Sequence, residues 1–188
     1  MRKTVIILGC ACLLSVSLAV AQTPIQVYGA WHCSNDYCSW GSVRTLANFD
    51  TANHWMIDRG DGEPSVNLVV FSFVNPVKLM KGTSDAHTAN GIPIGMTQTL
   101  VNYFTSKNVR VMFSIGGASY TKLWDKALSA NPAQLAKNAA AAAQQFGVGM
   151  EIDYENNSNP NLSGLEAFVC RATSYSRRRT QMPGPPAT

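Results

Sequence analysis

Charged side chains are scarce in this sequence, because only 14% of its 188 residues are Asp, Glu, Lys or Arg. Glycine and proline, at 14 and 9 residues, are too few for a collagen-like chain. Hydrophobic residues make up 46% of the chain, which is more than a disordered chain would contain. The composition therefore predicts a globular protein, and the length predicts one domain with room for a hydrophobic core.

Basic residues are few in the body of the chain. Residues 22–170 contain nine Lys and Arg against eleven Asp and Glu. The net charge of +4 comes from the two ends, from Arg2 and Lys3 and from four arginines between Arg171 and Arg179. A nucleic-acid-binding domain needs a basic face, which this body lacks. We therefore expect no nucleic-acid partner.

The first 21 residues have the pattern of a secretory signal peptide. A charged start, Met1-Arg2-Lys3, precedes an apolar run over residues 4–18, and Ala19-Val20-Ala21 then gives a small-x-small cleavage pattern. The apolar run is short for a membrane-spanning helix. We expect residues 1–21 to be removed and the protein to be secreted, to the extracellular space or a periplasm, with no membrane association afterwards.

Three cysteines remain after the signal peptide. Cys33 and Cys38 lie in one polar stretch, and Cys170 lies far along the chain. An oxidising compartment favours a local disulfide between Cys33 and Cys38. Free thiols are one alternative, and a metal site that adds His32 and His54 is another. Zinc ligands usually come as two close pairs, and only one pair is visible, so we expect the disulfide and no metal.

Four short runs rich in β-branched and aromatic residues predict strands. They are Ile25–Trp31, Val66–Phe73, Val109–Ile115 and Gly149–Glu155. The second and third runs are almost continuously hydrophobic, which is typical of parallel strands covered on both faces.

Helices fit between these runs. Residues 97–107 carry hydrophobic side chains at helical spacing. Asn131 followed by Pro132 predicts a helix start, and the alanine-rich run that follows ends at Phe146 before Gly147. Strands alternating with helices predict an α/β fold whose strands run parallel in sequence order, joined by right-handed crossovers.

The last 18 residues have a different character. From Arg171 onward the sequence has no hydrophobic period and no acidic residue, and a helix that starts near Ser163 is interrupted. We expect residues 171–188 to form an irregular, poorly packed basic tail, as a frameshift or a misread splice would produce. A basic interaction tail is the alternative.

The fourth predicted strand carries three carboxylates. Glu151, Asp153 and Glu155 alternate with Ile152 and Tyr154, and residues two apart on a strand point to one face about 6.6 Å from each other. Like charges gathered on a covered strand raise at least one pKa, and a general acid near neutral pH needs a raised pKa. Glu155 also ends the strand, where the catalytic groups of β/α barrels gather. The alternative is a solvated strand face.

Two motifs resemble the signatures of the family 18 glycoside hydrolases, the chitinase family. Ser114-Ile115-Gly116-Gly117 resembles S-x-G-G at the end of the third strand. Residues 148–155 (VGMEIDYE) resemble D-G-x-D-x-D-x-E, with Val148 and Glu151 in place of the first two aspartates. The resemblance covers residues 28–168.

The resemblance implies a fold. Family members are (β/α)₈ TIM barrels, which typically need about 250 residues. Four strands are visible here, so we expect only the first four β/α units of the barrel, a half-barrel with a parallel sheet over residues 22–170.

The resemblance also implies roles for the carboxylates. The reaction would be a substrate-assisted, retaining hydrolysis in which the N-acetyl carbonyl of the substrate is the nucleophile. Glu155 would protonate the glycosidic oxygen, and Asp153 would orient the N-acetyl group. Glu151 would share a proton with Asp153, and Ser114 would brace the carboxylates. No metal or organic cofactor is needed.

The same resemblance implies residues that touch the sugar. Tyr28 and Trp31 on the first strand resemble aromatics of the family's sugar cleft, and Tyr154 stands next to the acid. Gly116 and Gly117 would leave room for the sugar ring. The implied partner is chitin or another oligosaccharide that contains N-acetylglucosamine, and the oligomeric state is not implied.

The expected function is therefore that of a secreted chitinase-like hydrolase of β-1,4-linked N-acetylglucosamine. Because four strands of the barrel are missing, we expect this chain to be an incomplete and inactive form. A chitinase-like protein that binds carbohydrate without cutting it is the alternative, and a fragment with no function is the third interpretation.

Overall fold

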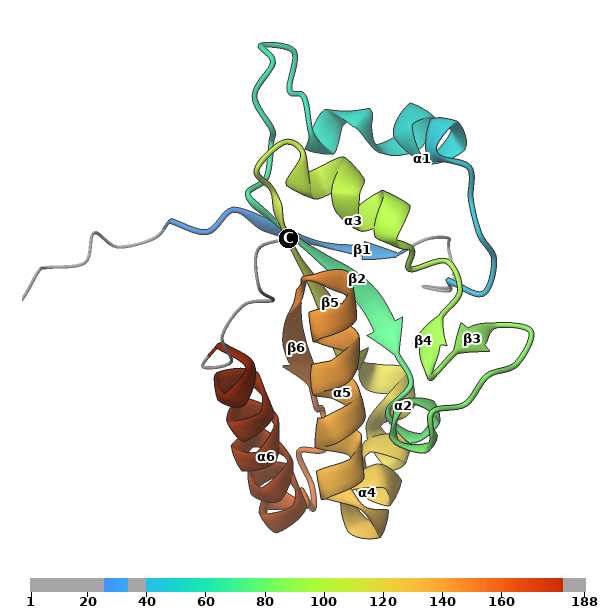
Figure 1. The fold of residues 1–188 in the computed structure, drawn as a ribbon, viewed down its shortest axis with the longest axis vertical. Coiled ribbons are helices and arrows are strands. Elements are labelled where there is room, and N and C mark those ends of the chain that lie inside the picture. The colour runs from blue at the N-terminus through green and yellow to red at the C-terminus, as the bar shows by residue number, and fades with distance from the viewer. Residues whose placement is uncertain (1–25, 34–39, 181–188) are drawn as a thin grey trace, which may run out of the picture.

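The computed structural model describes residues 26–33 and 40–180, with side chains up to Tyr175. This part of the chain forms a mixed α/β fold (Figure 1). The elements in chain order are β1 Gly29–Cys33, α1 Leu46–Asn53, the 3-10 helix η1 His54–Met56, β2 Leu68–Val74, α2 Pro76–Lys81, β3 Thr88–Ala89, β4 Ile92–Pro93, α3 Gln98–Thr105, β5 Arg110–Gly116, the 3-10 helix η2 Ala118–Tyr120, α4 Thr121–Ala130, α5 Pro132–Phe146, β6 Gly149–Asp153 and α6 Leu162–Thr180. Within the described ranges no helix is both long enough and apolar enough to cross a membrane.

The four long strands form one parallel sheet in the order β1-β2-β5-β6. Parallel pairing in sequence order was predicted, and it is confirmed. Strands β3 and β4 form a separate antiparallel pair between α2 and α3. The sheet is compatible with part of a TIM barrel, in which parallel strands follow one another around the axis.

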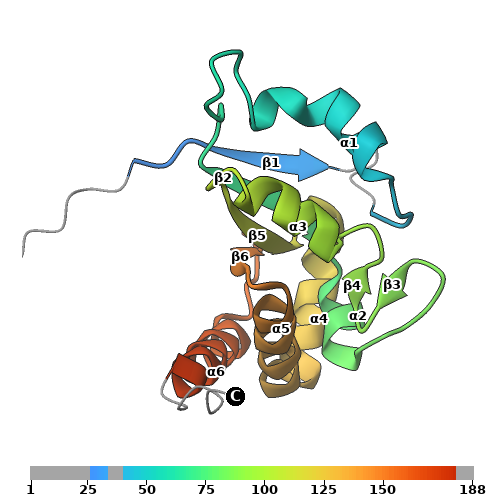
Figure 2. The ribbon, with the colours of Figure 1, turned by 45° about the horizontal axis from the view of Figure 1, so that its top comes forward.

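The helices pack on one face of the sheet. Side chains of α1, α3, α4, α5 and α6 join Val69, Phe71, Val111, Phe113 and Ile115 of the strands in one hydrophobic core. Figures 1 and 2 show α4, α5 and α6 gathered near β5 and β6, and α1 and α3 gathered near β1 and β2. The alternate strand residues, among them Trp31, Ser114 and Glu151, face away from these helices.

Helix α5 follows the sequence prediction. The Asn131 side chain accepts a hydrogen bond from the Gln134 backbone N–H at 2.9 Å, Pro132 occupies the first turn, and Gly147 ends the helix in a left-handed conformation. The short helices α1, α2 and α4 were not predicted from the sequence. A helix of six to ten residues has fewer than three turns, so its hydrophobic period is a weak signal.

Strand β6 ends two residues earlier than predicted. It stops at Asp153, which pairs with Gly116, the last residue of β5. Gly116 and Gly117 have φ angles of 119° and 87°, so the β5 backbone turns away and offers no further partner. Glu155 therefore lies in the loop just after β6 instead of on the strand.

The expectation of an irregular segment from Arg171 is wrong for residues 171–180. Helix α6 continues to Thr180, Ala172 is buried, and Tyr175 packs against the core. Phe168, Ala172 and Tyr175 are four and three residues apart, so they share one helix face. The sequence analysis missed this helical period because arginines and serines surround the hydrophobic residues. Residues 181–188 lie outside the described part.

The structure reports on part of the cysteine prediction. Cys33 is disulfide-bonded, whereas Cys170 is an exposed free thiol. Cys38 lies outside the described residues, so its pairing with Cys33 stays a prediction. The expected signal peptide, residues 1–21, also lies outside the described residues.

Candidate active site

The carboxylates of β6 lie on the face of the sheet opposite the helices. Glu151 pairs with Ser114 across the β5–β6 ladder, and Asp153 pairs with Gly116. Because these positions alternate with core residues such as Ile115, the side chains of Glu151 and Asp153 share the helix-free face. The shared face of these two residues follows the sequence prediction.

Glu155 lies at the carboxyl end of β6, and its carboxyl group is hydrogen-bonded to that of Asp153. Desolvation is the first cause that raises the pKa of Glu155, and the hydrogen bond and charge of Asp153 raise it further. The Ala118 backbone N–H also bonds to Glu155 and opposes part of this rise. The raised pKa favours the protonated form of Glu155, which is the form that can donate a hydrogen bond to Asp153.

Glu151 bonds to Ser114, the residue that the resemblance implied would brace the carboxylates. The hydroxyl of Ser114, a fully buried residue, donates a hydrogen bond to Oε2 of Glu151. The hydrogen bond of Asp153 goes to Glu155 instead of Glu151. The structure therefore brings together two pairs, Ser114 with Glu151 and Asp153 with Glu155.

The backbone of Asp153 is fixed from two sides. Its carbonyl oxygen accepts hydrogen bonds from the Gly117 backbone N–H at 2.9 Å and from the Trp124 indole N–H at 3.1 Å. The same indole N–H also donates to the Ile115 carbonyl oxygen at 3.1 Å. Trp124 is fully buried, so it ties the carboxyl ends of β5 and β6 together from the core.

Gly116 and Gly117 are needed by this backbone arrangement. A Cβ atom on Gly116 would lie 2.0 Å from the Asp153 carbonyl oxygen and 2.1 Å from the Trp124 indole nitrogen. A Cβ atom on Gly117 would lie 3.0 Å from the Phe73 ring. The space that a side chain would need at these two positions is therefore occupied by other atoms of the protein. The sequence interpretation had instead explained the two glycines by the room that a sugar needs.

Tyr154 points toward the helices instead of the carboxylate face. Its hydroxyl donates a hydrogen bond to Asp125 of α4 and accepts one from the Asn161 backbone N–H at 2.7 Å. Its ring lies against Trp124, with ring centroids 5.9 Å apart. Tyr154 therefore lies behind Glu155, where it does not face a sugar on the opposite side of the sheet.

The structure does not bring Tyr28 and Trp31 to Glu155. They belong to the β1 edge, whereas Glu155 follows β6 at the other edge of the sheet. Tyr28 precedes the amino end of β1 and donates its hydroxyl to Gln26 at 3.0 Å, whereas Glu155 lies at the carboxyl end. Trp31 is on the helix-free face with the carboxylates and is 61% exposed. Side chains three residues apart in an extended chain point to opposite faces. One sugar ring therefore cannot contact both Tyr28 and Trp31.

His32, one residue beyond Trp31, packs among aromatic rings. Its ring makes edge contacts with Trp40 and Phe49, at centroid distances of 5.6 and 5.2 Å. Burial, and after it the charge of Arg44, lower the pKa of His32 to about 4. Its Nε2 atom is buried without a hydrogen-bond partner. His32 is therefore a neutral member of the β1 core.

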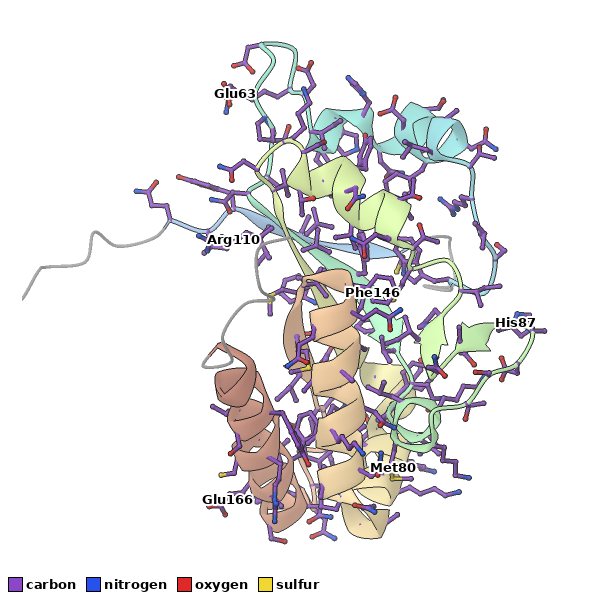
Figure 3. All side chains as sticks on the ribbon, in the orientation of Figure 1. Glu63, Met80, His87, Arg110, Phe146 and Glu166 are labelled. Atoms are coloured by element: carbon purple, nitrogen blue, oxygen red, sulfur yellow. The ribbon has the colours of Figure 1, made fainter. Side chains whose placement is uncertain are left out.

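A cavity of about 600 Å³ lies at the other end of the sheet. Its lining includes Leu68, Arg110 and Gly149, which stand at the amino ends of β2, β5 and β6, and it contains no carboxylate. Figure 3 labels Arg110 on this end of β5. Because the acid groups gather at the carboxyl ends, we place the candidate site there and not at this cavity.

The two other glutamates of the chain lie away from the site. Figure 3 shows Glu63 on the loop before β2 and Glu166 on the outer side of α6, at opposite ends of the view. Glu151 and Glu155 complete the set of four glutamates in the sequence.

Sequence reasoning missed the residues of α4 that hold the site. Trp124 bonds to Asp153, and Asp125 bonds to Tyr154 and to the Asn156 amide group at 2.9 Å. One signal existed in the sequence: a tryptophan next to an aspartate shortly after Gly117. Without the register of β5 and β6, nothing connected that pair with residues 153–156.

The fold resembles that of a known enzyme. A crystal structure titled as a GH18 chitinase from Pseudoalteromonas aurantia is similar to this chain, with a TM-score of 0.51 and 19% sequence identity. The similarity covers 84% of this chain and 52% of that protein, so this chain spans about half its length. No protein-family model and no curated protein matches the chain. At this identity the likeness concerns the fold alone: the chain has a chitinase-like fold over about half the length of that glycoside hydrolase.

Proposed function

We propose that this chain carries the general acid of a secreted glycoside hydrolase that cuts β-1,4-linked N-acetylglucosamine. The observation that supports this proposal is the hydrogen-bonded pair of Asp153 and Glu155 at the carboxyl end of β6, in which the pKa of Glu155 is raised. A raised pKa keeps a carboxylic acid protonated nearer to neutral pH, as proton donation to a leaving group requires. The chitinase-like fold supports the choice of substrate class.

The proposed reaction has two steps. Glu155 gives its proton to the glycosidic oxygen while the N-acetyl carbonyl oxygen attacks the anomeric carbon and the leaving sugar departs. Asp153 accepts a hydrogen bond from the acetamido N–H, and its charge stabilises the oxazolinium ion. Glu155 then takes a proton from water as the water oxygen attacks the anomeric carbon. This second step restores the N-acetyl group, the protonated acid and the original anomeric configuration.

Glu151 has a supporting part in this proposal. Ser114 fixes its carboxylate two residues before Asp153 on the same face. In this proposal the Glu151 side chain repels further negative charge nearby and so favours the protonated form of Glu155. Glu151→Asp, which gives the residue that the chitinase motif has at this position, should leave the activity equal or higher.

We also propose that the chain alone is an incomplete and inactive form. A (β/α)₈ barrel closes with eight strands, and the parallel sheet in the described residues has four. Both edge strands, β1 and β6, have one side without a neighbouring strand in this sheet. The full reaction would then need further β/α units to complete the sugar cleft.

The test measures hydrolysis of a chromogenic chitobioside by the longest natural gene product that contains this chain. Glu155→Gln keeps the shape of the acid and removes its proton, so we expect the rate to fall roughly 10²–10⁴-fold while sugar binding survives. Asp153→Asn should lower the rate on N-acetylated substrates more than on substrates without the N-acetyl group. Glu166→Gln, on the outer side of α6, is the matched control and should keep the wild-type rate. A Glu155→Gln protein as active as the wild type would place the acid elsewhere.

A second candidate function is carbohydrate binding without hydrolysis. The observation in its favour is Trp31, an exposed indole on the helix-free face, because sugars stack on such rings. Under this function the wild type binds chitin oligosaccharides without cutting them, Trp31→Ala loses the binding, and Glu155→Gln does not. The same assay with a binding measurement on both variants separates the two functions.

Export is part of the proposal. It is supported by the charged, apolar and small-residue pattern of residues 1–21. Expression of the full chain in a secreting host should release a protein that begins at Gln22. Retention of the whole chain inside the cell with Met1 in place would contradict export.

A further inference from the structure

Asp125 of α4 bonds to the residues on both sides of Glu155. One oxygen of its carboxylate accepts the hydroxyl of Tyr154, and the other accepts the amide N–H of Asn156 at 2.9 Å. Tyr154 immediately precedes Glu155, and Asn156 immediately follows it. A single carboxylate on a helix therefore spans the backbone position of the proposed acid.

The loop that carries Glu155 has further bonds around these two contacts. The Tyr154 hydroxyl accepts the Asn161 backbone N–H at 2.7 Å. The Asn156 amide group donates to the Asn159 carbonyl oxygen at 2.8 Å and accepts the Asn159 backbone N–H at 3.1 Å. These bonds close the loop from Tyr154 to Asn161 on itself, and Asp125 joins the closed loop to α4.

Helix α4 also holds the residue before this loop. The Trp124 indole N–H donates to the Asp153 carbonyl oxygen at 3.1 Å. Two consecutive helix residues, Trp124 and Asp125, therefore fix three of the four positions from Asp153 to Asn156. Burial and the hydrogen bond to Asp125 raise the pKa of the Tyr154 hydroxyl, so this group stays protonated and remains a donor.

The ordinary role of such an aspartate is to stabilise a loop. That role predicts a loss of stability when Asp125 is changed and no effect on Glu155. A positioning role predicts more, because Glu155 keeps its contact with Asp153 only while its neighbours stay in place. An active-site group displaced by about 1 Å can lose roughly 100-fold in rate. The two roles therefore differ in a measurable way.

We propose that Asp125 is a positioning residue, which acts through Tyr154 and Asn156 to hold the carboxyl group of Glu155 against Asp153. This inference rests on the proposed function of Glu155 as the general acid. In this proposal α4 supports the loop from Tyr154 to Asn161, which carries Glu155. Tyr154 then links that loop to α4 and does not contact the sugar.

The experiment titrates Glu155 directly in the full chain. Protein labelled with ¹³C at the glutamate carboxyl groups gives four signals, and Glu155→Gln identifies the one of interest. The groups that face this carboxyl are the Asp153 carboxyl and the Ala118 backbone N–H. Release of the loop separates the carboxyl group of Glu155 from that of Asp153, whose hydrogen bond and charge raise the pKa of Glu155. We therefore expect the pKa of Glu155 to fall in Asp125→Asn and equally in Tyr154→Phe, which keeps the charge of Asp125.

Asp50→Asn is the matched control. Asp50 of α1 also accepts a tyrosine hydroxyl, that of Tyr103 at 2.7 Å, but it lies away from β6. We expect it to lower the melting temperature without a change in the pKa of Glu155. An unchanged Glu155 titration in both Asp125→Asn and Tyr154→Phe, whatever their stability, would overturn the proposal. A change in Asp125→Asn alone would show an effect of charge and would overturn it too.

Kinetics separates this inference from the proposed function. In a form that hydrolyses chitobioside, Asp125→Asn and Tyr154→Phe should lower kcat roughly 10- to 100-fold with little change in KM. If the wild type cuts no glycan and the titration still responds, the proposed function fails while the positioning role of Asp125 stands. If Glu155→Gln abolishes hydrolysis and the titration does not respond, the function stands and this inference fails.

Discussion

The two edges of the parallel sheet differ in how firmly their outermost residues are held. At the β6 edge, the Asp153 carbonyl oxygen, the Tyr154 hydroxyl and the Asn156 amide group all bond to α4. At the β1 edge, Tyr28 and Trp31 are 62% and 61% exposed. The carboxylates are therefore ordered by residues of this chain. At the β1 edge Asn67 bonds to the backbone of Tyr28 at 2.9 Å, and the rings of Tyr28 and Trp31 stay largely exposed.

This difference bears on what a parallel sheet of four strands can do. The described residues alone bring the carboxyl groups of Asp153 and Glu155 together, and desolvation and Asp153 raise the pKa of Glu155. A sugar cleft needs walls on both sides, which one edge strand does not supply. The acid chemistry and the sugar binding of the proposed enzyme are thus separable, and each can be tested by itself.

The largest expected effect is that of Gly116→Ala. A Cβ atom there would meet the Asp153 carbonyl oxygen at 2.0 Å, at a φ of 119°. We expect the variant to lose about 3 kcal/mol or more of unfolding free energy, measured by urea denaturation.

Gly60→Ala is the matched control for this change. Gly60 has a similar φ of 101°, but nothing lies within 4 Å of the added Cβ atom. It should lose only about 1 kcal/mol, from backbone strain alone. Equal losses in the two variants would show that Gly116 does not meet the β6 edge as described.

Trp124→Phe should have the next largest effect. It keeps an aromatic ring in the core and removes the indole N–H that bonds to the Ile115 and Asp153 carbonyl oxygens. Loss of these buried bonds should cost about 1–3 kcal/mol of unfolding free energy and should disturb the Glu155 titration.

Trp40→Phe sharpens this comparison on the β1 side. Trp40 is also buried, and its indole N–H donates to the Ser72 carbonyl oxygen at 2.7 Å. The loss of stability should be similar, without any change at Glu155. A response of Glu155 to Trp40→Phe would mean that the two edges are not independent.

Features that depend on residues close together in the sequence could be predicted, whereas contacts between distant residues could not. The four parallel strands, the caps of α5 and the shared face of Glu151 and Asp153 follow from local patterns, and the structure agrees with them. The supports from α4 do not, because Trp124 and Asp125 reach residues 153–156 only once the register of β5 against β6 is set. Tyr28 and Trp31 are the opposite case, because a local pattern was available and was not used. Their three-residue spacing already predicts that they point to opposite faces, but the resemblance to a sugar cleft led us to group them.

A smaller effect is expected from pH on the β1 edge. The pKa of His32 is lowered to about 4 by burial and by Arg44, whereas in the unfolded chain it returns to 6.5. Between these values the unfolded state binds the proton and the folded state does not, so stability falls as the pH drops from 6.5 toward 4. Because the ring is only partly buried, we expect about 1–2 kcal/mol from this residue.

His32→Leu removes this contribution. Its unfolding free energy should depend less on pH between 7 and 4.5 than that of the wild type, as thermal or urea denaturation would show. An unchanged pH dependence in His32→Leu would mean that the His32 ring is not buried as a neutral group.

The smallest effect on stability is expected for Trp31→Ala. Its side chain is 61% exposed, so the unfolding free energy should change by no more than about 0.5 kcal/mol. Binding of chitin oligosaccharides, followed by calorimetry, should weaken nevertheless if the indole is the sugar platform. A large loss of stability would show that the β1 edge is packed, against the comparison drawn above.

The most direct test of the account is hydrogen exchange of the tryptophan indole N–H groups. The sequence has four tryptophans, and each gives its own signal in a ¹⁵N spectrum of the full chain. Trp40 and Trp124 are buried and hydrogen-bonded, whereas Trp31 and Trp55 are exposed. The account predicts slow exchange at Trp124, as at Trp40, and fast exchange at Trp31 and Trp55. Exchange at Trp124 as fast as at Trp31 would contradict the claim that this chain holds its carboxylate edge in place.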